Sequence, residues 1–251
     1  MARFFVPADM WSSGALPEPE ARHASQVLRM GEGDKAVVFD GRGRAAEVEL
    51  QDVRKKNVGF RIVREWREER VHPEIHLIVA LIKNERFDWL VQKATELGAA
   101  SIRPVAAARS VVKLEGKDAE KRRAKWEQAA IEAAKQCGHL VLPVIFPVSD
   151  PAAAFRSAPD GVKAIPALHE GGRPLGELLA GRPLAVSFAI GPEGDWTEAE
   201  MDSARDCGFV AVDLGKHVLR SETAALHVLS AAAHQLHGGV GGVRGGLSGV
   251  R

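Results

Sequence analysis

Two glycine-containing stretches, each following an apolar run, have the residue types that could hold a ligand. The run 184–190 leads into Gly191-Pro192-Glu193-Gly194, and the run 209–214 leads into Gly215 and a segment that ends at Arg220. In an open sheet of parallel strands, ligands bind beyond the carboxyl ends of the strands. Glycine lets the backbone approach a ligand closely, and an arginine can bind or stabilise negative charge. We therefore predict the active centre at these two strand ends, with Arg220 beside Glu222 and Thr223.

The segments around these stretches alternate between strand and helix patterns. One helix has two defined ends: Thr197 and Glu200 form a capping box that begins it at Glu198, and it stops at Gly208. The pattern predicts a largely parallel α/β sheet covered by helices on both faces. Strands are expected at 75–82, 101–105, 141–145, 162–168, 184–190 and 209–214, of which 184–190 is expected to be buried. Further helices are expected at 86–97, 118–137 and 222–236. The stripe Trp126, Ala130, Ala133 and Cys137 is expected to be the buried face of helix 118–137.

Residues 1–70 have a different pattern, which predicts a small β domain. Alternating runs at 35–40 and 46–50 flank a hairpin-like turn, and a third strand is expected at 58–63, after a short helix at 20–30. The charged segment 65–73 connects this domain to the next. The last residues are rich in glycine, which predicts a flexible tail. The predicted division is 1–70, 73–237 and 238–251.

Composition limits the classes of function. The chain of 251 residues is 45% hydrophobic and has a formal net charge of +1, so any surface for nucleic acid must be a local patch. Two cysteines, Cys137 and Cys207, are too few for a disulfide framework, which favours a cytoplasmic location. Nine histidines lack ligand spacing, so we expect no metal, and no apolar run approaches the length of a membrane span. Dinucleotide, nucleoside-triphosphate and serine-hydrolase motifs are absent from the sequence.

The two glycine-containing stretches together resemble the signature of a known family. Gly-Pro-Glu-Gly before a T-x-x-E helix, and LG-x-x-x-LR-x-ETA over 214–224, are similar to the RsmE family of ribosomal RNA methyltransferases, in the SPOUT superfamily. Residues 23–34 with 39–41 resemble its RNA-binding PUA-like domain. Its middle motifs are matched by Lys83, 94–98, 109–112 and 134–138. Two positions depart from the family pattern: Asp195 replaces a glycine, and His139 replaces an arginine.

The resemblance implies a SPOUT-like parallel sheet with a C-terminal trefoil knot, preceded by a small PUA-like β domain. The implied activity is transfer of the methyl group of S-adenosylmethionine to N3 of a specific uridine in 16S ribosomal RNA, presented as RNA or in the small ribosomal subunit. The implied assembly is a homodimer. Helix 222–236 is apolar nearly all round, which fits a subunit contact or burial within one domain equally. Two other functions stay open: a SPOUT methyltransferase acting on transfer RNA, and a non-catalytic RNA-binding assembly factor.

The resemblance also implies roles for individual residues. Arg220 and Glu193 are the candidate catalytic residues. Arg220 could stabilise negative charge on the uracil oxygens, or could form a salt bridge to Glu222 or Glu193 that supports the knot. Glu193 and Glu96 could accept a proton, with turn or capping roles as the alternative. The expected cofactor contacts are Leu168, His169, Gly191, Pro192, Glu193, Gly194, Leu214, Gly215, Val218, Leu219, Arg220, Thr223 and Ala224.

RNA contacts are expected from local basic groups on both domains. The start of helix 118–137 has several cations near its positive dipole end, which is consistent with phosphate binding or with an ordinary solvated face. The expected RNA-binding residues are Arg3, Arg22, Arg29, Lys83, Arg109, Lys121 and Arg122.

Overall fold

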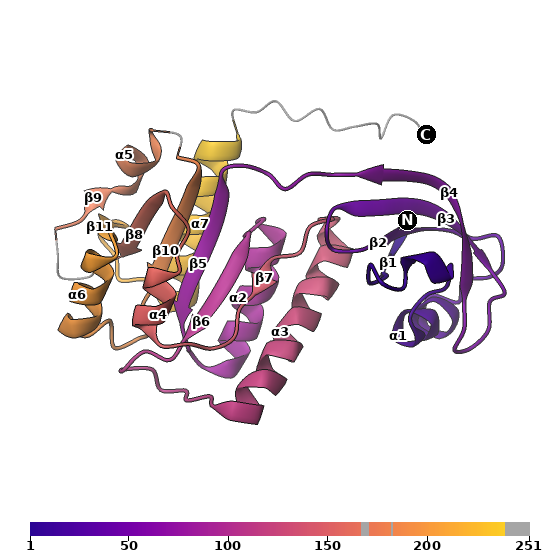
Figure 1. The fold of residues 1–251 in the computed structure, drawn as a ribbon, viewed down its shortest axis with the longest axis horizontal. Helices are drawn as coiled ribbons and strands as arrows, with labels where there is room; N and C mark the ends of the chain where they lie inside the picture. The colour runs from indigo at the N-terminus through magenta and orange to yellow at the C-terminus, as the bar shows by residue number, and fades with distance from the viewer. Residues whose placement is uncertain (167–170, 182, 239–251) are drawn as a thin grey trace.

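Two β-sheets organise the chain in the computed structural model, which describes residues 1–166, 171–181 and 183–238 (Figure 1). The N-terminal sheet has the order β1-β2-β3-β4, and the larger sheet has the order β7-β6-β5-β10-β8-β11-β9. In Figure 1 the first sheet lies at one end of the molecule, beside the long helix α3 (Gly116–Cys137). The outline of a largely parallel α/β sheet preceded by a small β unit is confirmed.

The N-terminal sheet is built on the predicted hairpin. Strands β2 (Lys35–Phe39) and β3 (Arg44–Gln51) pair antiparallel across the turn, and β4 (Gly59–Arg67) extends beyond the third predicted strand into the segment expected to be a connector. Strand β1 (Ala2–Phe5), which pairs parallel with β2, was not predicted. The region expected to be one helix is α1 (Glu18–Arg22) followed by a π-helical turn, η2 (His23–Val27), and a 3₁₀ turn, η1 (Trp11–Ser13), precedes both.

Every strand pair in the larger sheet is parallel. Its strands are β5 (Glu74–Ala80), β6 (Ser101–Val105), β7 (Val144–Ile145), β8 (Val162–Pro166), β9 (Arg173–Pro174), β10 (Ala185–Ile190) and β11 (Val210–Asp213). Strand β10 lies between β5 and β8, so the chain places its fully buried strand at the centre. The carboxyl ends of β8, β10 and β11 consequently lie next to one another.

Helices cover both faces of this sheet, as predicted. Their bounds are α2 (Asn84–Glu96), α3, α4 (Pro151–Arg156), α5 (Leu175–Leu179), α6 (Glu198–Asp206) and α7 (Ser221–His237). One core contains Phe87, Trp126, Leu179 and Val228, from α2, α3, α5 and α7. A second core contains Phe155 and Ala204, from α4 and α6. Burial on both faces is what allows the central strand β10 to be almost entirely apolar.

Three local expectations differ from the structure. Leu184 is 88% exposed and precedes β10 instead of beginning it. Strand β11 covers Val210–Asp213, which is shorter than the expected 209–214, and it is exposed at both ends because it lies near the edge of the sheet. Cys137 is exposed at the last position of α3, and Ala134, one turn earlier, is the buried residue. Among the described residues, no helix is long and apolar enough to cross a bilayer, and no three potential ligands cluster as a metal site.

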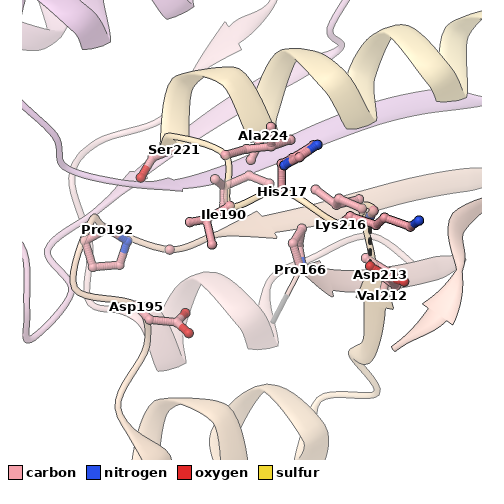
Figure 2. A pocket seen from close by; sticks show the side chains of 15 residues that line it. Pro166, Ile190, Pro192, Asp195, Val212, Asp213, Lys216, His217, Ser221 and Ala224 are labelled. Atoms are coloured by element: carbon pink, nitrogen blue, oxygen red, sulfur yellow. Dashed lines mark hydrogen bonds between the residues drawn. The ribbon is translucent and has the colours of Figure 1, made fainter. Parts of the chain in front are cut away.

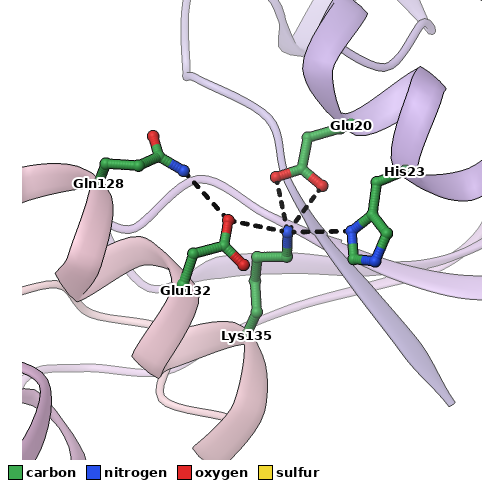
Figure 3. Close-up of polar contacts among 5 residues, drawn as sticks. All are labelled: Glu20, His23, Gln128, Glu132 and Lys135. Carbon is green, nitrogen blue, oxygen red and sulfur yellow. Dashed lines mark hydrogen bonds and ion pairs between the residues drawn. The ribbon is translucent and has the colours of Figure 1, made fainter. Parts of the chain in front are cut away.

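A buried ion pair joins α1, in the N-terminal unit, to α3, in the larger unit (Figure 3). The Nζ of Lys135 lies 3.0 Å from each carboxylate oxygen of Glu20, and it also contacts His23 Nδ1 at 3.5 Å and Glu132 Oε1 at 3.2 Å. The side chains of Lys135 and Glu20 are each 9% exposed. Burial raises the pKa of Glu20, while the Lys135 ammonium acts in the opposite direction. The contact therefore ties the N-terminal sheet to the longest helix of the other unit.

Replacing Lys135 with methionine should destabilise the protein by about 3–5 kcal/mol, because the Glu20 carboxylate would stay buried without its partner. The double variant Glu20→Leu, Lys135→Met should be closer to the wild type, since neither charge is then buried. Urea unfolding of the three proteins measures the difference. Lys93→Met is the matched control: Lys93 pairs with Glu96 at the surface, and its loss should cost less than about 1 kcal/mol. Equal losses in the single and double variants would contradict this account.

Candidate active site at the strand ends

A hollow lies beyond the carboxyl ends of β8, β10 and β11 (Figure 2). Its floor is formed by Pro166 and Ile190, its outer wall by the segment that follows β11, and its cover by the first turn of α7. This is the edge at which open parallel sheets bind ligands. The described lining is Pro166, Ile190, Gly191, Pro192, Asp195, residues 212–219, Ser221 and Ala224.

Many residues expected to contact a cofactor lie together around this hollow. Those that line it are Gly191, Pro192, Leu214, Gly215, Val218, Leu219 and Ala224. Four others lie nearby without lining it: Glu193, Gly194, Arg220 and Thr223. Leu168 and His169 fall outside the residues that the structure describes. The lining also includes polar groups that were not predicted, from Asp195, Asp213, Lys216, His217 and Ser221.

The wall after β11 depends on a glycine. Gly215 has φ of 106°, a left-handed conformation that other residues rarely adopt. Its backbone N–H donates to Asp213 Oδ1 at 2.8 Å, which closes the turn. A Cβ at this position would meet nothing within 4 Å, so the constraint is conformational and not steric. The turn leaves its backbone and the side chains of Leu214, Lys216 and His217 at the hollow.

The turn after β10 is constrained by contacts. A Cβ on Gly191 would lie 3.1 Å from Trp196 Nε1 and 3.3 Å from Asp195 Oδ1. Asp195 itself has φ of 61°, and its carboxylate accepts a hydrogen bond from the Trp196 N–H at 2.8 Å. Aspartate tolerates this left-handed conformation better than most residues. Asp195, one of the two departures from the pattern that the sequence resembles, is thereby compatible with the left-handed backbone of this turn.

Arg109 stabilises the turn after β10 with two hydrogen bonds. Its Nη1 donates to the carbonyl oxygens of Gly194 at 2.9 Å and Trp196 at 3.2 Å. Glu200 connects the same turn to the segment before Arg109. Its Oε2 accepts a hydrogen bond from the Thr197 N–H, in the predicted capping box, and its Oε1 accepts one from the Ala108 N–H at 2.8 Å. Arg109, expected to contact RNA, is thus also placed to position the turn.

Arg86, at the start of α2, was not singled out in the sequence. Its Nη1 lies 3.7 Å from Glu193 Oε1 and its Nε lies 3.7 Å from Glu222 Oε1, so it bridges the turn after β10 and the first turn of α7. The order of the strands explains its position. Because β5 and β10 are parallel neighbours, residues just after β5 lie close to the turn after β10. Sequence periodicity alone does not specify which strands are neighbours.

Arg220 has surroundings that differ from expectation. The apolar residues around Arg220 in the sequence predict that it is partly buried, but it is exposed, and it makes no ion pair or side-chain hydrogen bond with any described residue. The expected salt bridges to Glu193 and Glu222 are both made by Arg86. The Arg220 guanidinium is consequently free to bind a ligand at the rim of the hollow.

The other basic residues expected to bind RNA are spread over the surface. Lys83 is exposed before α2, and Lys121 is exposed near Asp118. Arg122 is 15% exposed in its side chain and donates to Asp88 at 2.7 Å.

In the N-terminal unit, Arg22 pairs with Glu18, and Arg29 is exposed in a left-handed conformation. Arg3 donates to the Lys135 carbonyl oxygen at 3.5 Å. Of the middle motifs, His139 Nε2 donates to the Glu96 carbonyl oxygen at 3.1 Å.

The lining suits a ligand with a flat polar part and an apolar or sulfur-containing part. Backbone groups of the two glycine turns can bond to a heterocycle, and the carboxylates of Asp195 and Asp213 can accept from hydroxyl or amino groups. Ile190, Leu214 and Leu219 provide apolar walls. These are the contacts that an adenosine linked to an amino acid through a sulfonium would need.

Comparison with known proteins gives consistent matches over nearly the whole chain. Residues 68–233 match the RNA methyltransferase domain family, and residues 16–63 match the RNA methyltransferase PUA domain family. Ribosomal RNA small subunit methyltransferase E of Bacillus subtilis is 36% identical, with 84% of this chain and 86% of that protein covered. The enzyme of the same name from Mycobacterium bovis is 30% identical, with 84% and 82% covered.

A solved structure supports the same assignment. Ribosomal RNA small subunit methyltransferase E of Neisseria gonorrhoeae, bound to S-adenosylmethionine, superimposes with a TM-score of 0.85 at 34% identity. The superposition covers 93% of this chain and 97% of that one. The motifs, the sheet order and these matches agree, and this chain belongs to the ribosomal RNA small subunit methyltransferase E family.

Proposed function

We propose that this protein transfers the methyl group of S-adenosylmethionine to N3 of a specific uridine in 16S ribosomal RNA. The observation that carries the proposal is the hollow at three adjacent strand ends, lined by the glycine turns of the family signature. The relative from Neisseria gonorrhoeae, which has the same fold, was solved with this cofactor. The substrate follows from family membership, as small-subunit ribosomal RNA appears in the names of the relatives.

The residues of the hollow would hold the cofactor in the following way. Gly191, Gly215 and their neighbouring backbone groups would bind the adenosine, with Leu214, Val218 and Leu219 as apolar walls. The cofactor supplies an electrophilic methyl group on a positively charged sulfur. The protein's own contribution is to fix this group in line with the attacking nitrogen, which is mainly a matter of positioning.

The RNA side of the reaction places different demands on the protein. Uridine N3 is protonated at neutral pH and is paired inside a duplex, so the base must be exposed and its proton removed or shared. Loss of this proton places negative charge on the uracil oxygens. Arg220, exposed and without a partner among the described residues, is suited to stabilise that charge. Arg3, Arg22, Arg29 and Lys83 would position the RNA backbone.

Several further features belong to this proposal. The N-terminal 1–70 unit would bind RNA and the 73–237 unit would carry out the reaction, in the cytoplasm. The chain would form a homodimer through α7, where Leu226, Ala231 and Ala233 are incompletely buried. The C-terminal trefoil knot is also proposed, as the arrangement that would enclose the cofactor.

Mass mapping of ribosomal RNA tests the proposed activity. A strain that lacks this protein should lose one methyl group from a single uridine of 16S RNA, and expression of the protein should restore it. Purified protein should then incorporate the methyl group of labelled S-adenosylmethionine at the same uridine. Loss of a modification from transfer RNA instead would contradict the substrate, and cofactor binding without any lost modification would favour a non-catalytic assembly role.

A further inference from the structure

A second depression lies beside the first, between the starts of α2 and α7. It is lined by Glu85, Arg86, Trp89, residues 218–220, Glu222 and Thr223. Val218 and Leu219 line both depressions, so the same two residues form a wall of each. A group bound in the second depression would therefore lie next to a ligand in the first. Neither the family signature nor the proposed cofactor contacts explain why Trp89 is there.

Trp89 is an unusual residue for an exposed helix position. Its neighbours Phe87 and Leu90 are buried in the core, whereas Trp89 is 45% exposed and no described ring or cation stacks on it. A single exposed apolar residue needs no explanation, but an indole at the edge of a hollow offers a flat face for stacking. Stacking of a nucleic-acid base on an aromatic side chain contributes about 1–3 kcal/mol.

Glu222 provides an independent observation at the same place. Its side chain is 10% exposed, and Oε2 is buried without a hydrogen-bond partner among the described residues. Its other oxygen is 3.7 Å from Arg86 Nε. A buried carboxylate oxygen without a donor is costly, and such groups commonly await a ligand or water. The terminal torsion of glutamate is soft, so a small rotation can present either oxygen to the depression.

We propose that this second depression binds the target uracil, extruded from the RNA, with Trp89 stacked on the ring and Glu222 facing N3. This assignment rests on the proposed function, and it adds the place where the base binds and the group that takes its proton. Arg220, on the same rim, would face a ring oxygen. Because Val218 and Leu219 line both depressions, the bound base would lie next to the cofactor hollow.

The chemistry of the base edge explains why a carboxylate is suited to this position. Uracil presents an N–H at N3 between two acceptor oxygens, whereas cytosine presents a lone pair at N3. A carboxylate accepts a hydrogen bond from the first and repels the second. In the reaction the N3 proton passes to a Glu222 oxygen, the nitrogen lone pair forms the new bond to the methyl carbon, and the carbon–sulfur bond breaks with its electron pair left on sulfur. Charge and atoms balance without another reactant.

Binding of a 16S RNA fragment that contains the mapped uridine tests this site, with the same fragment carrying cytidine as the comparison. Trp89→Ala should weaken binding of the uridine fragment about 10-fold, which corresponds to about 1.4 kcal/mol. Trp89→Phe should retain most of the affinity because it keeps a ring. Glu222→Gln should abolish the preference for uridine over cytidine, since an amide can also donate to cytosine N3. Cofactor affinity should stay within about twofold of the wild type in all three variants.

Two controls make the outcomes distinct. Leu184→Ala, which shortens an exposed apolar side chain just before the amino end of β10, and Glu177→Gln, on α5, lie outside the depression and should leave binding and preference unchanged. A Trp89→Ala protein with normal affinity, or a Glu222→Gln protein with an intact uridine preference, would overturn the site. So would a Trp89→Ala protein that is monomeric where the wild type is dimeric, because Trp89 would then belong to a subunit contact. Failure of the wild-type protein to methylate the uridine would instead contradict the proposed function.

Discussion

Replacing Gly191 with valine is expected to lower the affinity for S-adenosylmethionine about 100-fold in a protein that remains folded. A Cβ at this position would already lie 3.1 Å from Trp196 Nε1. Trp196 is only 4% exposed and packs against Phe155, so it has little room to move. The valine side chain would therefore be forced toward the hollow, or would displace the turn that lines it. Titration calorimetry measures the affinity, and circular dichroism checks the fold.

The matched control for this variant is Gly31→Val. Gly31 is exposed in the N-terminal unit, and a Cβ there would meet nothing within 4 Å. Gly215→Val should resemble Gly191→Val for a different reason, because valine is strained at φ of 106°. If both hollow variants bind the cofactor as the wild type does, the cofactor site lies elsewhere in the protein.

Replacing Arg220 with alanine is expected to lower the single-turnover rate of methyl transfer by about 10²–10³, the usual cost of losing a donor to developing negative charge. Since Arg220 is exposed and has no partner among the described residues, the melting temperature and the cofactor affinity should change little. Arg220→Lys should recover little activity, because an ammonium cannot reproduce the planar pair of donors. Rapid quenching with saturating cofactor gives the rate.

The opposite result would reveal a structural role. If Arg220→Ala reduces thermal stability and cofactor affinity together, Arg220 braces the fold and does not act on the base. Arg156→Ala is the control, because Arg156 is an exposed arginine on α4. A variant with normal stability and a normal rate would exclude both roles for Arg220.

The features that the sequence predicted correctly are those fixed by neighbouring residues. The apolar run of β10, the capping box of Thr197 and Glu200, and the glycine turns each depend on a few consecutive positions. The location of the hollow followed from a general rule about strand ends, once the strands were recognised. The family resemblance added the cofactor and the substrate, which periodicity does not contain.

The features that it missed depend on the order of strands in space. Arg86 bridges Glu193 and Glu222 because β5 lies beside β10, although 100 or more residues separate them along the chain. Arg86 therefore contacts the two carboxylates, of Glu193 and Glu222, that were expected to pair with Arg220, and Arg220 stays exposed. Strand β1 was missed because four residues are too few to show a period, and its pairing with β2 is also distant in sequence.

The bracing of the turn after β10 has a consequence for the kinetics of cofactor binding. Arg109 and Glu200 already satisfy the carbonyls of Gly194 and Trp196 and the N–H groups of Thr197 and Ala108. The turn after β10 is therefore ordered before the cofactor binds, so binding loses little free energy in ordering it. Association should then proceed in one step, with an observed rate that rises linearly with cofactor concentration. In the Arg109→Ala variant, the observed association rate should reach a plateau at high cofactor concentration, because ordering of the turn then limits the rate.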